Sequence, residues 1–423
     1  MNQYMPRLID QILINKLKGK GAVLIQGPKW CGKTTTAEQV AKSILYMDEP
    51  EQKEQNIQLA DISPSMLLDG DTPRLIDEWQ LAPKLWDAVR FAVDHRSGKG
   101  HFILTGSYVP PVLSETSHSG TGRFAWLTMR NMSLYESRES TGEVSIAELF
   151  AGKENINGKN ALDIRRIAYL VCRGGWPDIL ELDEDIALEA AADYLDGVVN
   201  SDISRVDNIN RDPERARRIM RSYARNQGSQ IAYTEIAKDI SGNELNFTDE
   251  TVASYAKALK KIFVVEDMPA WNPNLRSRTS IRATDTRYFS DSAIAAAALG
   301  IGPNDLISDL NTLGLLFETM CIRDLRIYAE SLGGTVYHYR DRSGLECDAV
   351  VHLRNGHYGL IEIKLGGDHL INEGAANLLK LEKMIDTEKM SAPSFKMILT
   401  GTDRYAYRRP DGIFVVPIGC LKN

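Results

Sequence analysis

Paired cysteines, long hydrophobic runs and an excess of positive charge are all absent from this sequence of 423 residues. Its five cysteines are scattered and no C-x-x-C pair occurs, so the sequence indicates neither a zinc site nor a disulfide framework. Reduced thiols are expected instead, as in a cytoplasmic protein. No apolar run reaches the length of a membrane span, and the first residues contain no signal-peptide core, so we expect no membrane segment. The cysteines are Cys31, Cys172, Cys321, Cys347 and Cys420.

The charge balance limits how the chain could bind nucleic acid. With 50 Lys and Arg against 57 Asp and Glu, the net charge is −7, which excludes a basic surface over the whole molecule. Any binding of DNA must therefore come from a local patch. Hydrophobic residues at 43% and charged residues at 25% are typical of a globular protein, and the length suffices for roughly two to four domains.

The strongest motif is a glycine-rich turn at residues 27–34, which reads GPKWCGKT and fits G-x-x-x-x-G-K-[ST] at every fixed position. An apolar run precedes it and a helical pattern follows, which is the context this motif requires. Its backbone N–H groups can surround phosphate oxygens, Lys33 can reach the β- and γ-phosphates, and the Thr34 hydroxyl can bind Mg²⁺. We therefore predict ATP binding. The predicted nucleotide contacts are Gly27, Pro28, Lys29, Trp30, Cys31, Gly32, Lys33, Thr34, Thr35 and, from a later strand, Thr105.

An acidic pair follows a short apolar strand predicted at residues 74–76. Asp77 would orient Mg²⁺, directly or through water, and Glu78 would activate the attacking water as general base. Acidic pairs at strand ends are common, so this assignment depends on the phosphate loop upstream. A further strand at 101–107 should lie next to the one that carries Asp77. Its tip would bring the Thr105 or Ser107 hydroxyl near the γ-phosphate, although the same residues also suit an ordinary turn.

A loop at residues 117–123 is rich in glycine and serine and ends in Arg123. An exposed arginine there could contact the γ-phosphate of its own subunit or that of a neighbour in a homo-oligomer, and it could equally be an ordinary surface residue. Strands alternate with helices up to about residue 150. This alternation predicts an α/β domain with a mainly parallel sheet over residues 1–150.

Several sequence strings resemble a known family in the expected order. GPKWCGKTTTA, LIDEWQ, ILTGS, GTGR and RNMSLYES are similar to the AAA+-like, archaeal-type ATPases of the AAA_14 group. Downstream, RGGWP (173–177), DISRVD (202–207), SYARN (222–226) and PAWNPNLRS (269–277) resemble the C-terminal part that those proteins share, a domain of unknown function, DUF4143.

This resemblance implies roles for particular residues. Lys33 and Thr34 would bind phosphate and Mg²⁺, Asp77 and Glu78 would form the hydrolytic pair, and Arg123 would be the arginine of a GR motif. The bulky Trp30 and Cys31 depart from the family pattern, in which smaller residues are commoner, but no fixed position of the loop changes.

The middle of the chain is predicted as a helical linker over 151–210 and a winged-helix-like domain over 211–284, built from three helices and a strand at 262–267. The first helix starts at Asp212, and its arginines recur at four-residue steps on one face, which could serve nucleic acid, a neighbouring subunit or solvent. The third helix carries side chains that could contact a DNA groove or phosphates, although winged helices often bind protein. These residues are Arg217, Arg221 and Arg225, and Tyr255, Lys257, Lys260 and Lys261.

The last region, 285–423, contains a second acidic group. Glu318 lies on a predicted helix, Asp348 on a strand, and Glu362 and Lys364 two residues apart on the next strand, where they share a face. Carboxylates can hold Mg²⁺, and a lysine can activate water and stabilise the charge of a phosphorane. The set resembles the PD-(D/E)XK nuclease fold, which implies metal ligands at Glu318, Asp348 and Glu362 and a catalytic Lys364. Alternative acids for the same site are Asp341 and Glu346.

Together these patterns predict an α/β protein with a P-loop AAA+-like ATPase domain, a helical and winged-helix middle and a C-terminal restriction-endonuclease-like α/β domain. The favoured function is Mg²⁺-dependent ATP hydrolysis coupled to DNA binding or processing, with nuclease activity at the second site. The alternative is an ATP-driven switch in signalling or defence that binds protein partners. Its nuclease-like domain would then be inactive, since that fold often survives as a binding module.

Overall fold

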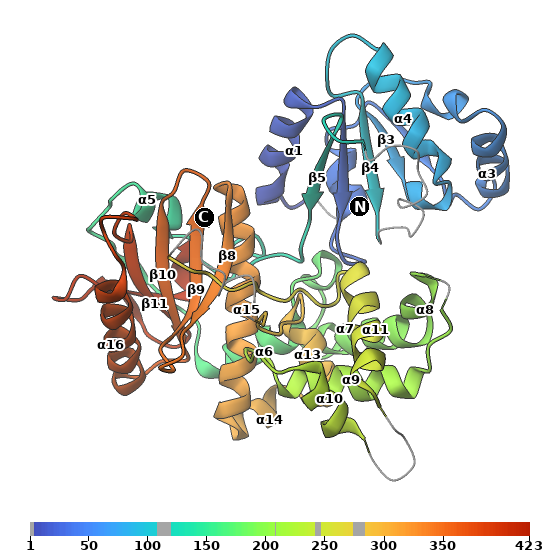
Figure 1. Ribbon diagram of the computed structural model, residues 1–423. Helices are drawn as coiled ribbons and strands as arrows, with labels where there is room; N and C mark the ends of the chain where they lie inside the picture. Colours follow the sequence, from blue (N-terminus) through green and yellow to red (C-terminus); the bar gives the residue numbers. More distant parts are fainter. Residues whose placement is uncertain (1–3, 108–119, 208, 242–246, 274–283) are drawn as a thin grey trace. The chain divides into compact units, whose positions relative to one another are not determined.

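The computed structural model describes residues 4–107, 120–207, 209–241, 247–273 and 284–423 (Figure 1). The chain forms two compact units, each assembled from separate stretches of sequence. The first unit comprises Met1–Asn131, Asn200–Arg211 and Lys257–Phe263, and the second comprises Met132–Val199, Asp212–Ala256 and Val264–Asn423. We expected residues 132–150 in the ATPase domain, but they pack in the second unit.

A five-stranded parallel sheet forms the centre of the first unit (Figure 1). All five residues of the central strand β4 (Phe102–Gly106) are buried, as expected for a parallel sheet that is covered on both faces. The predicted neighbourhood of residues 101–107 and the strand before Asp77 is confirmed, because Leu75 pairs with Ile103. In the order β2-β3-β4-β1-β5, the strands are β1 (Ala22–Gln26), β2 (Ser43–Tyr46), β3 (Arg74–Asp77), β4 (Phe102–Gly106) and β5 (Phe124–Thr128).

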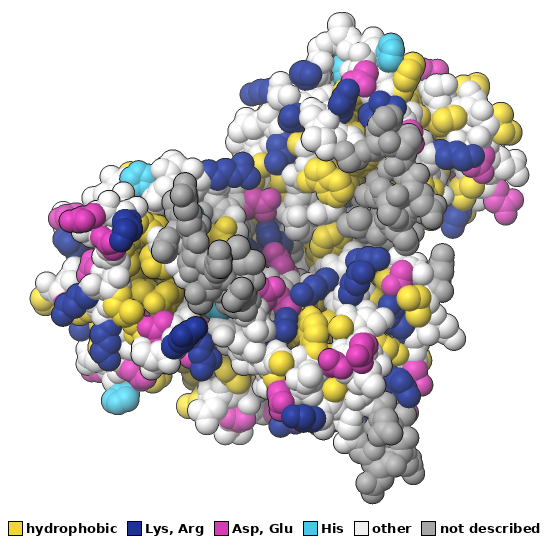
Figure 2. Space-filling model, viewed as in Figure 1, with side chains coloured by type: hydrophobic (Ala, Val, Ile, Leu, Met, Phe, Trp, Pro, Cys, Tyr) yellow, Lys and Arg dark blue, Asp and Glu magenta, His cyan; other side chains and the backbone are white. Residues whose placement is uncertain are grey.

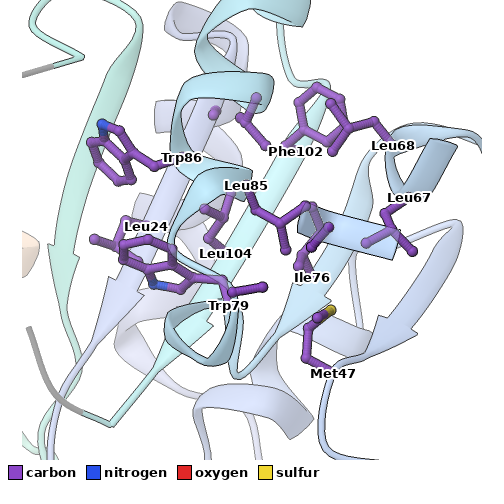
Figure 3. Close-up of a cluster of buried hydrophobic side chains, with 14 of the residues drawn as sticks. Leu24, Met47, Leu67, Leu68, Ile76, Trp79, Leu85, Trp86, Phe102 and Leu104 are labelled. Atoms are coloured by element: carbon purple, nitrogen blue, oxygen red, sulfur yellow. The ribbon is translucent and has the colours of Figure 1, made fainter. Parts of the chain in front are cut away.

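Alternate residues of each strand face opposite sides of this sheet and pack against different helices. Val23 joins a hydrophobic cluster with Leu13 of the first helix, whereas the next residue, Leu24, joins a cluster on the other face. In Figure 3, Trp79 and Trp86 lie beside Leu24 in that second cluster. Helices α1 (Leu8–Gly19) and α2 (Lys33–Glu38) belong to the first face, and α3 (Lys53–Ile62) and α4 (Lys84–His95) to the second.

The second unit contains a helical part and a mixed sheet. In the helical part, the predicted strand at 262–267 is wrong. Val265 and Met268 instead make isolated bridges with Phe289 and Thr286. The helices are α5 (Ile146–Phe150), α6 (Ile164–Arg173), α7 (Glu184–Gly197), α9 (Pro213–Arg225), α10 (Tyr233–Ile240), α11 (Asp249–Lys261), α13 (Ser292–Leu299), α14 (Pro303–Ser308) and α15 (Leu310–Ser331). The last residues of α11 cluster with the first unit.

The mixed sheet of the second unit has seven strands in the order β7-β12-β13-β11-β10-β9-β8. Helix α16 (Asp368–Met384) covers one face of it through Ile371, Leu378 and Leu381, which belong to one hydrophobic cluster with Leu360 of β10. The strands are β7 (Gly158–Lys159), β8 (Gly334–Arg340), β9 (Glu346–Leu353), β10 (Tyr358–Lys364), β11 (Phe395–Thr400), β12 (Tyr405–Arg408) and β13 (Phe414–Pro417). A separate pair joins β6 (Val144–Ser145) to β14 (Leu421–Lys422).

A buried ion cluster holds the helical part of the second unit together. The Arg323 guanidinium on α15 donates to Asp324 at 2.8 Å and to Asp291 at 3.1 Å, and all three side chains are at most 1% exposed. The same carboxylates accept backbone N–H groups from Leu134 at 2.8 Å and from Gly175 at 3.1 Å. The strings RNMSLYES and RGGWP therefore supply backbone donors to this cluster, which explains why residues 132–150 belong to the second unit.

Among the helices that the structure describes, none combines the length and the apolar composition that crossing a bilayer would require.

Replacing Arg323 by Ala should strongly destabilise the second unit, because two carboxylates would stay buried without their cation. Breaking a buried ion pair in this way costs about 3–5 kcal/mol. We expect a clear drop in the midpoint of thermal unfolding, measured by circular dichroism. Arg218→Ala is the matched control, because Arg218 is exposed and its pair with Glu214 on α9 should contribute roughly 0–1 kcal/mol. Equal midpoints for both variants would show that the cluster is not central to stability.

Candidate functional site

The phosphate loop, residues 27–34, connects β1 to α2 and depends on two glycines. A side-chain carbon at Gly27 would lie 2.0 Å from the Met129 carbonyl oxygen, so only glycine fits there. Gly32 has a φ of 94°, in the left-handed region that favours glycine, and it caps the start of α2. Cys31 is fully buried beside Met129, so its thiol is not accessible from solvent.

Other predicted loop residues have distinct surroundings. The Lys33 ammonium is buried and donates to the carbonyl oxygens of Gly27 at 3.1 Å and Pro28 at 2.7 Å, so it lies inside the loop. Trp30 has a φ of 65° and its side chain is 56% exposed, which explains how the loop tolerates such a bulky residue. Thr35 lies on the exposed side of α2.

Asp77 is the meeting point of three elements. Its carboxylate, at the end of β3, accepts hydrogen bonds from the Thr34 hydroxyl at 2.8 Å and from the Thr105 hydroxyl of β4. Burial raises the pKa of Asp77, and the two hydroxyls oppose that shift. The structure thus brings Thr34 and Thr105 together at Asp77.

Glu78 follows directly and adopts a left-handed conformation with φ 52°. Its carboxylate accepts a hydrogen bond from the Gln80 side chain and one of 3.3 Å from the Ser107 hydroxyl. Burial raises its pKa, and the charge of Asp77 adds to the shift. A carboxylate with a raised pKa accepts a proton more readily, which is the property that a general base needs.

Two residues that support the loop have no signal in the sequence. Arg7 precedes α1 and donates to the carbonyl oxygens of Cys31 at 2.9 Å and Arg130 at 2.8 Å. These two hydrogen bonds hold the backbone of the phosphate loop against the residues that follow β5. The Tyr4 hydroxyl lies 3.0 Å from the Thr36 hydroxyl of α2 and donates to Asp10. The sequence separation between α1 and the loop hides both contacts.

Arg123 lies at the N-terminal ends of the parallel strands, whereas the phosphate loop lies at their C-terminal ends. It precedes β5, whose register places Phe124 beside Ala22 and Thr128 beside Gln26 at the start of the loop. A strand of five residues separates these two ends of the sheet by about 15 Å. Arg123 is partly exposed and pairs with Asp94 of α4 at 2.8 Å. The interpretation of Arg123 as a sensor in its own subunit therefore disagrees with the sheet geometry, while a contact with a neighbouring subunit stays a prediction.

A second polar cluster forms where β9 and β10 pair. The Lys364 ammonium lies 2.7 Å from Glu362 and 3.4 Å from Asp348, and Asp348 also accepts the Ile363 N–H at 2.7 Å. Glu362 is 1% exposed, and among the described residues its Oε1 atom has no hydrogen-bond partner. Gly374 of α16 lies over both side chains, because a side-chain carbon there would be 3.3 Å from Glu362. The predicted Asp348, Glu362 and Lys364 are thus brought together.

Glu318 of α15 is close enough to this cluster for its carboxyl group to interact electrostatically with Asp348. Its carboxylate accepts a hydrogen bond from the Tyr288 hydroxyl, and burial with the nearby charge of Asp348 raises its pKa to about 8. The same two causes raise the pKa of Glu362 to about 8. The alternative acids are engaged elsewhere: Asp341 accepts N–H groups within its own hairpin turn, and Glu346 pairs with Arg340 at 3.1 Å.

The part of the chain that the structure describes contains no group of three or more His, Cys, Asp or Glu side chains arranged to hold a metal ion. The ammonium of Lys364 instead lies between two of the carboxylates. The predicted set of Glu318, Asp348 and Glu362 is therefore gathered in one place but not arranged as a three-carboxylate metal site.

Most of the predicted DNA-contacting residues are engaged in contacts within the chain. Arg217 pairs with Asp196 and Arg225 with Asp239, at 2.8 and 2.7 Å. Tyr255 is buried, with its hydroxyl 3.1 Å from the Asp212 nitrogen, so it cannot enter a groove. Figure 2 shows basic and acidic side chains interspersed over the face it draws. Arg221 and Lys257 are exposed.

Three family models match consecutive parts of the chain. Residues 19–137 match an AAA domain, AAA_14, residues 164–305 match a domain of unknown function, DUF8612, and residues 313–421 match the domain of unknown function DUF4143. The resemblance to the AAA_14 group is thus confirmed, and the chain carries an AAA domain followed by a C-terminal DUF4143 domain. The four downstream strings, RGGWP to PAWNPNLRS, fall within the DUF8612 match rather than within DUF4143, and the end of the last string lies outside the described residues.

Two curated relatives are uncharacterised proteins of Mycobacterium tuberculosis and Mycobacterium bovis. Each is 26% identical to this chain over 348 residues, which covers 81% of this chain and 70% of the relative. Among solved structures, the chain is similar to a Walker-type ATPase of Pyrococcus abyssi, with a TM-score of 0.44 and 12% identity over 70% of this chain and 96% of that one.

The raised pKa of Glu318 predicts a stability that depends on pH. A glutamate whose pKa rises from 4.5 to about 8 on folding binds its proton more tightly when folded. Its contribution to stability is complete below about pH 4.5 and is lost as the pH rises through about 8. Glu318→Gln keeps an acceptor for Tyr288 and removes the charge, so its midpoint of thermal unfolding should match the wild type near pH 5 and exceed it at pH 8.5. Exposed Glu189→Gln should leave the midpoint unchanged at both values. A constant difference across this range would contradict the raised pKa.

Proposed function

We propose that the chain hydrolyses ATP with Mg²⁺ at the phosphate loop and uses the energy in handling nucleic acid. The observation that carries the ATPase proposal is the 2.8 Å hydrogen bond between the Thr34 hydroxyl and the Asp77 carboxylate. It joins the end of the phosphate loop to the acidic end of β3, so one ion could contact both groups and the phosphates of ATP together.

The residues present fit Mg²⁺. This ion prefers oxygen ligands and keeps several waters, so one hydroxyl, one carboxylate and the nucleotide phosphates suffice, and a cage of three protein carboxylates is not needed. Thr34 and Asp77 would hold it, and Mg²⁺ would supply neutralisation of the phosphate charge. The Lys33 ammonium would neutralise further charge after exchanging the Gly27 and Pro28 carbonyl oxygens for phosphate oxygens.

Glu78 would take the proton of the attacking water. Gln80 and Ser107 hold its two carboxylate oxygens, which orients the group, and the raised pKa prepares it to accept a proton. Thr105 would fix the position of Asp77 rather than contact the γ-phosphate directly, because its hydroxyl already donates to that carboxylate.

The ATPase proposal predicts different effects for two substitutions. Glu78→Gln should bind ATP normally and hydrolyse it about 10²–10⁴-fold more slowly, because the general base is lost while the phosphate contacts stay. Lys33→Ala should lose ATP binding itself. Binding would be measured with a fluorescent ATP analogue and hydrolysis by phosphate release, with exposed Glu54→Gln on α3 as control. Normal binding and hydrolysis by Lys33→Ala would overturn the proposal.

The second cluster supports the nucleic-acid half of the proposal. The Lys364 ammonium lies 3.4 Å from the Asp348 carboxylate and 2.7 Å from the Glu362 carboxylate. In the described part of the chain, one buried oxygen of Glu362 has no hydrogen-bond partner. A divalent cation would fit this chemistry if Lys364 moved toward a phosphate. Asp348 and Glu362 would then hold the ion with Glu318, and Lys364 would stabilise charge on the cleaved phosphodiester.

The alternative function is an ATP-driven switch that binds protein partners and does not cut DNA. The observation that favours it is the pairing of Arg217 and Arg225 with acidic residues, which reduces the basic surface available to DNA. Measuring the ATPase rate with and without DNA separates the two. Stimulation by DNA supports nucleic-acid handling, whereas no stimulation and no gel shift at low salt favours the switch.

Nuclease action at the second cluster predicts Mg²⁺-dependent nicking of supercoiled DNA that disappears in Lys364→Ala. Lys364 is the cation that would stabilise the developing charge, whereas Lys380 is exposed on α16 and its replacement by Ala should leave nicking unchanged. Gel electrophoresis with and without chelator measures both. Equal nicking by Lys364→Ala and wild type would identify a contaminating nuclease and remove the assignment.

A further inference from the structure

Two exposed tyrosines lie on the outer part of the mixed sheet of the second unit. Tyr405 and Tyr407 belong to β12 and are 57% and 41% exposed, whereas Ala406 between them is buried. Residues two apart on a strand point to the same face, so both tyrosine rings lie on one side of the sheet. Single exposed aromatic side chains are common on protein surfaces, but two on one face of a strand offer flat rings side by side for stacking.

The tyrosine pair shares a face of the sheet with the second polar cluster. Tyr407 pairs with Val415 of β13, and Val415 belongs to the hydrophobic cluster that α16 forms with Leu360 of β10. Leu360 is followed at two-residue steps by Glu362 and Lys364, so these side chains point to the same side. One ligand on this face can therefore contact both the tyrosine pair and Lys364.

A row of paired residues leads across the sheet from Lys364 to the tyrosine pair. Lys364 pairs with Thr400 of β11, and Thr400 pairs with Pro417 of β13. Continued by two residues, the register of β12 with β13 places Tyr405 beside Pro417. Neighbouring strands lie about 4.8 Å apart, so three steps across the sheet separate Lys364 from Tyr405 by roughly 14 Å. A single strand of nucleic acid spans this distance with a few nucleotides.

Two cations flank Tyr405. Lys159 of β7 pairs with Tyr405 in the sheet, so its side chain lies on the same face, and Arg404 directly precedes Tyr405 in the chain. Both side chains are exposed, and no described residue forms an ion pair with either of them. Arg408 differs, because it alternates to the other face and pairs with Glu154 at 3.1 Å. The charges of Lys159 and Arg404 are therefore left for an anionic ligand.

We propose that Tyr405 and Tyr407 bind a single-stranded nucleic acid by stacking on its bases. Lys159 and Arg404 contact its phosphates, and the strand continues along the sheet toward Lys364. This inference rests on the proposed nucleic-acid function of the second cluster and names the substrate class of that site. Stacking on protein rings requires bases that are not already stacked in a duplex, so the surface favours single strands. Because every base has a flat face, such stacking tolerates any sequence.

The first test measures the affinity of the full chain for a fluorescently labelled oligothymidine by anisotropy at low salt. Tyr405→Ala should weaken binding about tenfold, because it removes the ring on which one base stacks. Tyr405→Phe keeps the ring and should bind like the wild type. Phe91→Ala is the matched control and should leave the affinity unchanged, since Phe91 is 58% exposed but belongs to α4 of the first unit.

The second test uses the salt dependence of the same affinity. A lysine that contacts a phosphate releases counterions on binding, so Lys159→Ala should reduce the slope of log affinity against log salt by about 0.7. Tyr405→Ala should leave this slope unchanged, because stacking involves no charge. Arg408→Ala is the control for the loss of a cation from β12, and it should change neither the affinity nor the slope, since Arg408 is on the other face and already paired.

The outcomes separate this inference from the proposed function. If the wild type binds neither single-stranded nor double-stranded DNA at low salt, the nucleic-acid function itself fails and the inference fails with it, which leaves the tyrosine pair to a protein partner. If the wild type binds single strands and the double variant Tyr405→Ala, Tyr407→Ala binds them equally well, nucleic-acid binding stands and the role of the tyrosine pair is wrong. Tighter binding of a duplex than of a single strand would also overturn the inference.

Discussion

The proposed ATP site depends on one buried carboxylate. Asp77 accepts hydrogen bonds from Thr34 of α2 and Thr105 of β4, so its position fixes the phosphate loop, the acidic strand and the neighbouring strand relative to one another. A buried carboxylate needs such donors, because burial without them costs several kcal/mol or neutralises the group. The strand order β3-β4-β1 is the arrangement that allows both hydroxyls to reach it.

The second unit depends on a different kind of buried charge. Arg323 holds Asp291 and Asp324, and these carboxylates in turn bind backbone N–H groups of Leu134 and Gly175. A buried ion pair adds little net stability compared with a well-packed apolar cluster, but it is favourable only when its charged groups and their hydrogen-bond partners are in one particular arrangement. Here it joins α15 and α13 to two loops from elsewhere in the chain, so it specifies which segments pack together.

The sequence was most informative where a pattern is local. The phosphate loop and its flanking strand, the acidic end of β3 and the pairing of β3 with β4 follow from apolar runs and short motifs, and the structure confirms these elements. The β9 and β10 strands with Asp348 and Glu362 follow from the same logic. The strand at 262–267 was wrong because its apolar residues pack as isolated bridges beside the helices and make no ladder.

Contacts between residues far apart in sequence could not be predicted. Arg7 fixes the phosphate loop and Asp202 binds Lys29 across 173 positions, and neither contact leaves a periodicity or a motif in one sequence. Arg123 was misplaced for a related reason. The composition of its loop suggested exposure, but only the parallel register of β5 shows at which edge of the sheet an exposed residue lies.

The two acidic clusters differ in a way that bears on their chemistry. Among the described residues, Asp77 and Glu78 accept side-chain hydrogen bonds from three hydroxyls and one amide. These carboxylates are therefore positioned before a ligand arrives. In the second cluster, the buried Oε1 of Glu362 lacks a donor among the described residues, and Lys364 alone balances its charge and that of Asp348. An unsatisfied buried oxygen costs about 1–3 kcal/mol. That cost is removed if a cation or a proton occupies the cluster, and the raised pKa of Glu362 reflects the proton. A bound proton or cation would therefore stabilise the second cluster, whereas the carboxylates of the first cluster already have their donors in place.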